Sequence, residues 1–63
     1  MMGLPISRSE MRERLIRVGG DVGMAGDEIA RKDGNPAHAV AYLRRARSNI
    51  DAVLDELAKE GVL

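Results

Sequence analysis

The stretch that decides the fold is residues 36–60, PAHAVAYLRRARSNIDAVLDELAKE, which contains no glycine and no proline after Pro36. Asn35 stands immediately before it as a favourable N-cap, and Pro36 has the fixed φ that suits a first helical turn. Gly61 follows as a left-handed stop. The stretch therefore predicts one long helix with both ends marked.

The side chains that would form the packing face of this helix recur at alternating intervals of three and four residues. The series is Val40, Leu43, Arg47, Ile50, Leu54 and Leu57. This is the a/d rhythm of a helix that packs against other helices, and Arg47 is its one charged member.

A second series with the same rhythm precedes it in the chain, and it consists of Met11, Leu15, Val18, Val22, Ala25 and Ile29. Ser7 and Glu10 form a capping box at its start, and the Lys-Asp-Gly segment 32–34 ends it. We therefore expect a first helix over about 8–33, a turn over 33–35 and a second helix over about 36–60. Two helices joined by so short a turn form an antiparallel hairpin.

Alignment of the two series across the turn places Met11 level with Leu57 and Val22 level with Arg47. Every apolar residue of one series has a counterpart in the other, so we expect the two stripes to meet between the helices. This interpretation leaves other apolar residues uncovered, namely Ile16, Met24, Ala41, Ala46 and Val53.

Glycines are unusually frequent inside the first helix, where each costs about 1 kcal/mol relative to alanine. Gly19, Gly23 and Gly26 are spaced four and three apart, which predicts a groove of small residues that a neighbouring helix can approach closely. The alternative is a break at residues 19–21, which would give three short helices in the chain. The apolar register continues across these residues and favours one continuous helix.

The length of 63 residues allows one domain, 1–63, and a chain this short buries only about 60% of its unfolded surface. It has no cysteine and one histidine, so neither a disulfide framework nor a closed zinc site can supplement the core. We therefore expect oligomerisation. Ten basic and ten acidic residues give no net charge, and no run approaches the ~20 apolar residues of a membrane span. We expect a cytoplasmic protein with no membrane association.

No combination of side chains predicts catalysis, a cofactor or a metal site. His38 and Tyr42 lie one turn apart, but no further ligand completes a metal set, and no serine has a histidine or lysine at motif spacing. Arg44, Arg45 and Arg47 form the one local basic cluster. They either pair with Asp21 and Asp27 across the hairpin or contact phosphates.

One family resemblance covers about 45 residues. It consists of Arg14-Leu15-x-Arg17-Val18-x-Gly20-x-Val22, then Ile29, a short turn, and Arg47-x-x-Ile50-Asp51-Ala52-Val53-x-x-x-Leu57. This pattern resembles the two main helices of the copper-sensitive operon repressor family. The resemblance implies an all-helical dimeric four-helix bundle that contacts operator DNA through Arg14, Arg17 and Arg47. The metal ligands of that family are not matched, because Asn35-Pro36 and Gly61 stand where a cysteine and a histidine would be expected.

The sequence thus predicts an all-α antiparallel two-helix hairpin that pairs with a second copy into a dimeric four-helix bundle. The expected function is a non-catalytic oligomerisation or protein-interaction module, and the alternative is a DNA-binding regulator that lacks the metal site. The expected packing residues are Leu15, Val18, Gly19, Val22, Gly23, Gly26, Ile29, Val40, Leu43, Ile50, Val53, Leu54 and Leu57. The possible DNA contacts are Arg14, Arg17, Arg44, Arg45 and Arg47.

Overall fold

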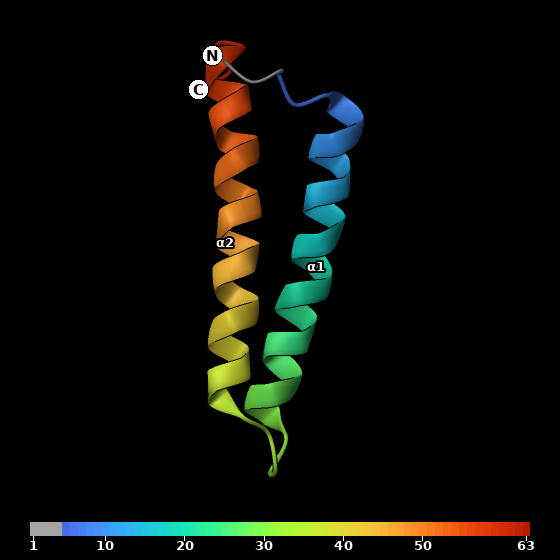
Figure 1. Cartoon of the computed structure of the whole chain (residues 1–63), viewed down its shortest axis with the longest axis vertical. Helices are drawn as coiled ribbons and strands as arrows, with labels where there is room; N and C mark the ends of the chain where they lie inside the picture. Colours follow the sequence, from blue (N-terminus) through green and yellow to red (C-terminus); the bar gives the residue numbers. More distant parts are fainter. Residues whose placement is uncertain (1–4) are drawn as a thin grey trace.

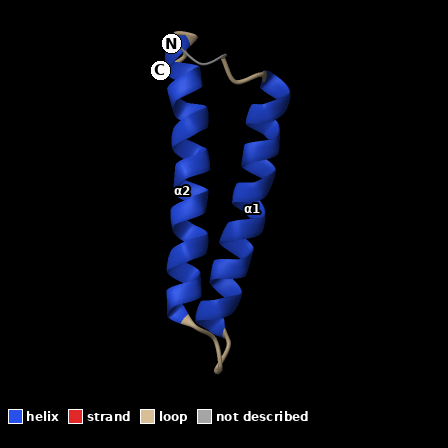
Figure 2. Ribbon diagram, viewed as in Figure 1, coloured by secondary structure: helices blue, strands red, loops and turns tan. Residues whose placement is uncertain are grey.

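The computed structural model describes residues 5–63 and contains two helices, α1 (Arg8–Ala30) and α2 (Pro36–Lys59). The helices run antiparallel, side by side, and are joined by one tight turn (Figures 1 and 2). The described part of the chain contains no strand, and the predicted all-α hairpin is confirmed. Residues 1–4 of the predicted domain lie outside the described residues.

Helix α1 begins at the predicted cap, where the Ser7 hydroxyl accepts a hydrogen bond from the Glu10 backbone N–H at 3.1 Å. The helix then continues without interruption through all four of its glycines. The prediction of a continuous helix is therefore confirmed, and the alternative of a break at residues 19–21 is wrong.

The end of α1 differs from the prediction, because the helix stops at Ala30 and Arg31 is already extended (φ −75°, ψ 143°). The chain then folds back so tightly that a Cβ on Gly34 would lie 1.8 Å from the carbonyl oxygen of Glu28. Gly34 has a negative φ, so a glycine is required here by close approach and not as a left-handed stop. The Glu28 carboxylate accepts the Asn35 backbone N–H at 3.1 Å and fixes the turn.

Helix α2 has the predicted signals at both ends. The Asn35 side chain accepts the Ala37 backbone N–H at 2.9 Å, which caps the start. The helix ends at Lys59, one residue earlier than expected, and Gly61 has a φ of 81°. The Leu57 carbonyl accepts the Glu60 N–H at 3.2 Å and the Val62 N–H at 3.1 Å, which closes the helix end.

The two helices contact each other along an inner seam, to which each contributes residues at alternating intervals of three and four. In each helix one heptad position is mainly apolar and the other polar. In α1 these are Met11, Val18 and Ala25, then Arg14, Asp21 and Glu28; in α2 they are Ala39, Ala46 and Val53, then Tyr42, Asn49 and Glu56. All of these residues are buried or half-buried.

The contacts between the helices agree with the predicted alignment at the open end and depart from it by a few residues toward the middle, where they set Arg47 nearer residues 14–21 than Val22. Arg45 pairs with Asp21 near the middle of the hairpin, and Arg8 pairs with Glu60 at the end opposite the turn. The helices lie closest near the turn (Figure 1), where the seam contains small alanines.

The predicted inner face is confirmed at Met11, Val18 and Ala25 of α1. It is wrong by one residue, or about 100° of rotation, at the other α1 positions and along the whole of α2. Leu15 and Leu54 were expected to meet in one layer, but they are 49% and 42% exposed. Ala46 and Val53, expected on an uncovered surface, are buried in the inner seam. The physical reason is that each apolar stripe is wider than one neighbouring helix can cover, so the hairpin contact uses the edge whose small residues allow close approach.

The core of the single hairpin is small. Its buried apolar side chains are Met11, Ala25, Ala39, Ala46 and Val53, and three of these five are alanines. No side chain of the described residues is less than 2% exposed. The radius of gyration is 14.3 Å, whereas a compact domain of this length would have about 10–11 Å. The hairpin is therefore a rod with little interior.

Candidate interaction surface

One side of the hairpin is polar and the other is apolar. On the polar side, hydrogen-bonded side-chain pairs connect the two helices. Asp21 is 6% exposed, and its carboxylate accepts hydrogen bonds from Arg45 Nη2 at 2.6 Å and Nε at 3.1 Å. These hydrogen bonds hold the pKa of Asp21 below its ordinary value of 3.8. Arg45 also lies over the Tyr42 ring at 5.6 Å, within the range of a cation–π contact.

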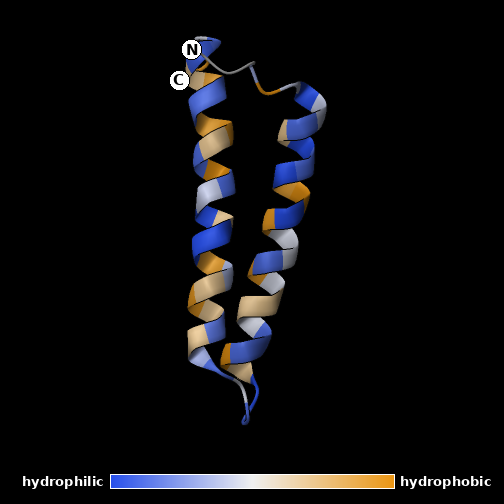
Figure 3. Cartoon of the chain, in the orientation of Figure 1, coloured by the Kyte–Doolittle hydropathy of each residue, from blue (hydrophilic) through white to orange (hydrophobic). Residues whose placement is uncertain are grey.

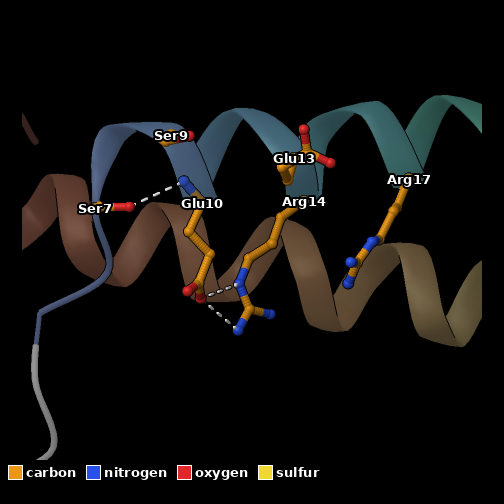
Figure 4. Close-up of a pocket in the computed structure, with 6 residues that line it drawn as sticks. All are labelled: Ser7, Ser9, Glu10, Glu13, Arg14 and Arg17. Carbon is orange, nitrogen blue, oxygen red and sulfur yellow. Dashed lines mark hydrogen bonds and ion pairs between the residues drawn. The ribbon is translucent and has the colours of Figure 1, made fainter.

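A second polar pair crosses the seam nearer the open end of the hairpin. Arg14 Nη1 donates to Asn49 Oδ1 at 2.9 Å, and its other guanidinium nitrogens donate to Glu10 at 3.2 and 3.3 Å. Figure 4 shows Arg14 held against Glu10, which lies one turn earlier in α1. Glu10, Arg14 and Arg17 line one hollow, and Arg17 joins no ion pair within the described residues.

Glu28 organises the end of the hairpin that carries the turn. Besides the Asn35 N–H, its carboxylate contacts Arg31 at 3.2 Å and His38 Nδ1 at 3.3 Å. The backbone hydrogen bond from Asn35 is the main reason that the pKa of Glu28 is lowered from 4.5. The cluster is thus a structural tie between the end of α1 and the start of α2.

These polar groups are already satisfied by one another. Among residues 5–63, no buried side-chain nitrogen or oxygen lacks a hydrogen-bond partner. Over the same residues, no group of three or more histidine, cysteine or acidic side chains is placed to hold a metal ion. Neither of the two described helices has the length and hydropathy needed to span a bilayer.

The other side of the hairpin is an apolar face that nothing within residues 5–63 covers. We define it by Leu15, Val22 and Ile29 of α1 and by Val40, Leu43, Ile50 and Leu54 of α2, which are 38–66% exposed. Bands of hydrophobic residues run along both helices in Figure 3. The face contains most of the predicted packing residues, while Val18 and Leu57 are half-buried beside it and Val53 lies inside.

Both halves of the apolar face lie on the same side of the hairpin for a geometric reason. In each helix, every residue of the face directly follows a residue of the inner seam, as Val22 follows Asp21 and Ile50 follows Asn49. One step along a right-handed helix rotates the side chain by about 100°. Because α1 and α2 run in opposite directions, the same step turns their side chains to the same side. The two stripes therefore form one continuous surface.

The predicted glycine groove is open in the single chain, since a Cβ on Gly19, Gly23 or Gly26 would meet no atom within 4 Å. Gly19 follows Leu15 by four residues and precedes Val22 by three, so it lies on the flank of the apolar face. Gly26 has the same relation to Val22 and Ile29.

The five arginines proposed as DNA contacts are divided between the two sides. Arg14 and Arg45 are engaged in the polar pairs, and Arg17 lines a hollow together with Arg45 and Asp21. Arg44 and Arg47 instead line a hollow beside the apolar face, with Val40 and Leu43. The pairing of Arg45 with Asp21 confirms the intramolecular alternative for this residue.

Sequence reasoning missed the polar half of the inner seam, although a signal was present. Arg14, Asp21 and Glu28 are seven residues apart in α1, and Tyr42, Asn49 and Glu56 are seven apart in α2. A polar heptad next to an apolar one indicates a seam stabilised by hydrogen bonds, but a search for apolar periodicity alone passes over it.

In comparisons with known proteins, no protein-family model matches the chain, and neither a curated protein nor a solved structure matches it significantly.

Proposed function

We propose that this chain is a non-catalytic self-assembly module, in which the apolar face of one hairpin packs against that of a second copy to form a four-helix bundle. The observation that carries the proposal is the rotation of the stripes. In a four-helix bundle the a/d side chains point toward the bundle axis, while contacts between neighbouring helices also use the positions beside them. The hairpin is compatible with this arrangement: most of the α2 stripe and Leu15, Val22 and Ile29 of α1 are turned to one side, while Met11, Val18 and Ala25 stay in the inner seam.

The size of the exposed surface supports the same proposal. The chain exposes 4984 Å², whereas a compact monomer of 6.8 kDa would expose about 4,000 Å². The excess of roughly 1,000 Å² is comparable with the ~800 Å² per partner that a standard protein interface buries. A second hairpin on the apolar face would therefore bring the exposed surface into the usual range.

A matched pair of substitutions tests the proposal. Ile50 is 38% exposed within the apolar face, and Ile16 is 55% exposed outside it, so Ile50→Lys and Ile16→Lys make the same chemical change on and off the face. We expect light scattering at micromolar concentration to give twice the chain mass of 6.8 kDa for the wild type and for Ile16→Lys. Ile50→Lys should give the monomer mass, because it would bury a charge in an apolar interface. A wild type of 6.8 kDa would overturn the proposal.

DNA binding of the kind implied by the copper-sensitive operon repressor resemblance is the second candidate. It is supported by Arg17, Arg44 and Arg47, which form no ion pair among residues 5–63. These arginines lie on two different sides of the hairpin, so one copy offers no continuous basic surface. A gel shift with random duplex at low and moderate salt distinguishes the candidates, because phosphate binding weakens steeply with salt. A shift that persists in Ile50→Lys would favour the DNA candidate.

A further inference from the structure

We propose that the two-fold axis of the dimer runs parallel to the helices, so that both turns lie at the same end of the bundle and α1 of each copy packs against α2 of the other. This inference rests on the proposed function, because it concerns how the two copies are oriented across the apolar face. The residue that decides the orientation is Arg47.

Two hairpins packed face to face can be related by an axis in either of two directions within the shared face. An axis perpendicular to the helices places α1 against α1 and α2 against α2, with the turns at opposite ends. An axis parallel to the helices places α1 against α2 of the other copy. All neighbouring helices are antiparallel in both arrangements, so helix direction alone does not choose between them.

Arg47 interrupts the apolar stripe of α2. It stands between Leu43 and Ile50 in the series, at the middle of the range Pro36–Lys59, and it lines a hollow with Val40 and Leu43. Asp21, the carboxylate of the seam at this level, is already taken by Arg45. The Arg47 guanidinium joins no ion pair among residues 5–63, so its charge remains for the second copy to accommodate.

A perpendicular axis accommodates Arg47 badly. Equivalent residues meet where such an axis crosses the bundle, and for two fully overlapping α2 helices that point is their middle. Arg47 would face Arg47 of the other copy, surrounded by the side chains of the apolar face. Two like charges brought together in an apolar interface repel strongly, and this disfavours the arrangement.

A parallel axis removes this contact between like charges. The contacts of Arg45 with Asp21 and of Asn49 with Arg14 bracket Arg47 and set it level with α1 residues 14–21. A parallel axis preserves levels, so Arg47 of one copy would lie against the same segment of the other copy. That segment contains Gly19, which lies on the flank of the apolar face. A Cβ placed on Gly19 would meet no atom within 4 Å. The long arginine side chain can cross this gap and keep its charge in water.

The charges at the helix ends do not affect this choice. Residues 8–17 carry a net charge of +2 (four arginines, two glutamates), and residues 51–60 carry −3 (four acids, one lysine). Toward the turn, residues 27–33 at the end of α1 and beyond it carry −1, and residues 36–45 of α2 carry +2. Opposite charges therefore meet in both arrangements, and Arg47 is the feature that distinguishes them.

Spin-label distances test the orientation directly, because the chain has no cysteine of its own. Asp33→Cys carries a nitroxide at the turn, and Ser9→Cys carries one at the opposite end. With a parallel axis, electron paramagnetic resonance should give label separations of about 10–20 Å within each labelled dimer, on the scale of one or two helix spacings. A perpendicular axis predicts separations near the 45 Å length of the hairpin. Mixing the two labelled variants gives heterodimers with one label at residue 33 and one at residue 9. For these heterodimers, a parallel axis predicts the long separation and a perpendicular axis predicts the short one.

Substitution of Arg47 tests its role. In an Asp33→Cys background, Arg47→Leu removes the repulsion and should allow both orientations, giving short and long separations together. Arg44→Leu removes a neighbouring arginine outside the a/d series and should leave the short separation alone. A long separation in the unsubstituted dimer, or a single short one in Arg47→Leu, would overturn the inference and leave the dimer intact. Loss of any dipolar signal with a mass of 6.8 kDa would instead overturn the proposed function.

Discussion

Individual residues in this hairpin are constrained by what lies next to them, and the glycines show it most clearly. All the glycines of α1 face open space, whereas a Cβ on Gly34 would overlap the backbone of Glu28. Within the single hairpin, the same residue type is therefore replaceable in the helix and indispensable in the turn. From the sequence alone, the helix glycines would be expected to be the more constrained. A glycine inside a helix costs stability, which suggests that close packing requires it.

Gly34→Ala should lower the free energy of unfolding by about 1–3 kcal/mol, because the turn must open to admit the methyl group. Gly20→Ala is the matched control. It adds the same atoms to α1 where no neighbour lies within 4 Å, and it should raise stability by about 1 kcal/mol through helix propensity. Urea midpoints of the two variants measure both effects. A neutral Gly34→Ala would contradict the close approach at the turn.

Asp21 gives the hairpin an expected dependence on acid pH. Its pKa in the folded chain lies below 3.8, chiefly because of the hydrogen bonds from Arg45. The charged carboxylate therefore contributes to stability above about pH 4, and this contribution is lost as the pH falls through the folded-state pKa. Asp21→Asn should reduce stability at neutral pH and make the acid loss shallower, with Glu28 supplying the remaining slope.

Denaturant melts of Asp21→Asn from neutral to acid pH, at fixed protein concentration, measure this slope. Asp33→Asn is the control, because Asp33 lies in the turn and joins no ion pair among residues 5–63. An unchanged acid slope in Asp21→Asn would show that the pair with Arg45 does not form in solution.

At the scale of the helices, each helix presents two distinct faces. One is the inner seam, with its alternating apolar and polar heptads, and the other is the apolar face, with larger side chains. The polar seam positions fix the register of α1 against α2, because a slip of one turn would leave Asp21 buried without Arg45.

A substitution at Ala46 tests which face of α2 lies in the inner seam. It is 3% exposed in the inner seam, so Ala46→Leu should separate the helices and lower the free energy of unfolding by about 1–3 kcal/mol. Ala41→Leu makes the same change at an exposed position of α2 and should alter stability by no more than about 0.5 kcal/mol. Equal effects in the two melts would mean that α2 is rotated differently from the structure.

At the scale of the whole molecule, the chain is a rod of 45 × 21 × 18 Å with an apolar face along it. A rod of this kind has little interior, and small domains are marginal even when compact, so we expect the single hairpin to be of low stability. Under the proposed self-assembly, folding and association are one equilibrium, and stability depends on concentration.

The melting temperature of the wild type should therefore rise by about 5 °C for each tenfold increase in protein concentration. Circular dichroism melts over a hundredfold range of concentration measure this directly. Ile50→Lys should melt at a lower temperature that does not change with concentration. A wild-type melting temperature independent of concentration would contradict the coupling of folding to assembly.

The sequence by itself determined the two helices, both N-caps, the end of α2, the position of the turn and the approximate alignment along the hairpin. These features depend on local chemistry, such as the Ser7 hydroxyl, Asn35 and Gly61, and on the lengths on either side of the turn. Only the tertiary structure decided the rotation of each helix about its axis. Periodicity identifies an apolar stripe but not which edge of it meets a given neighbour. That choice depends on how closely Ala46 and the other seam alanines let the helices approach, and on Arg45 reaching Asp21 across them.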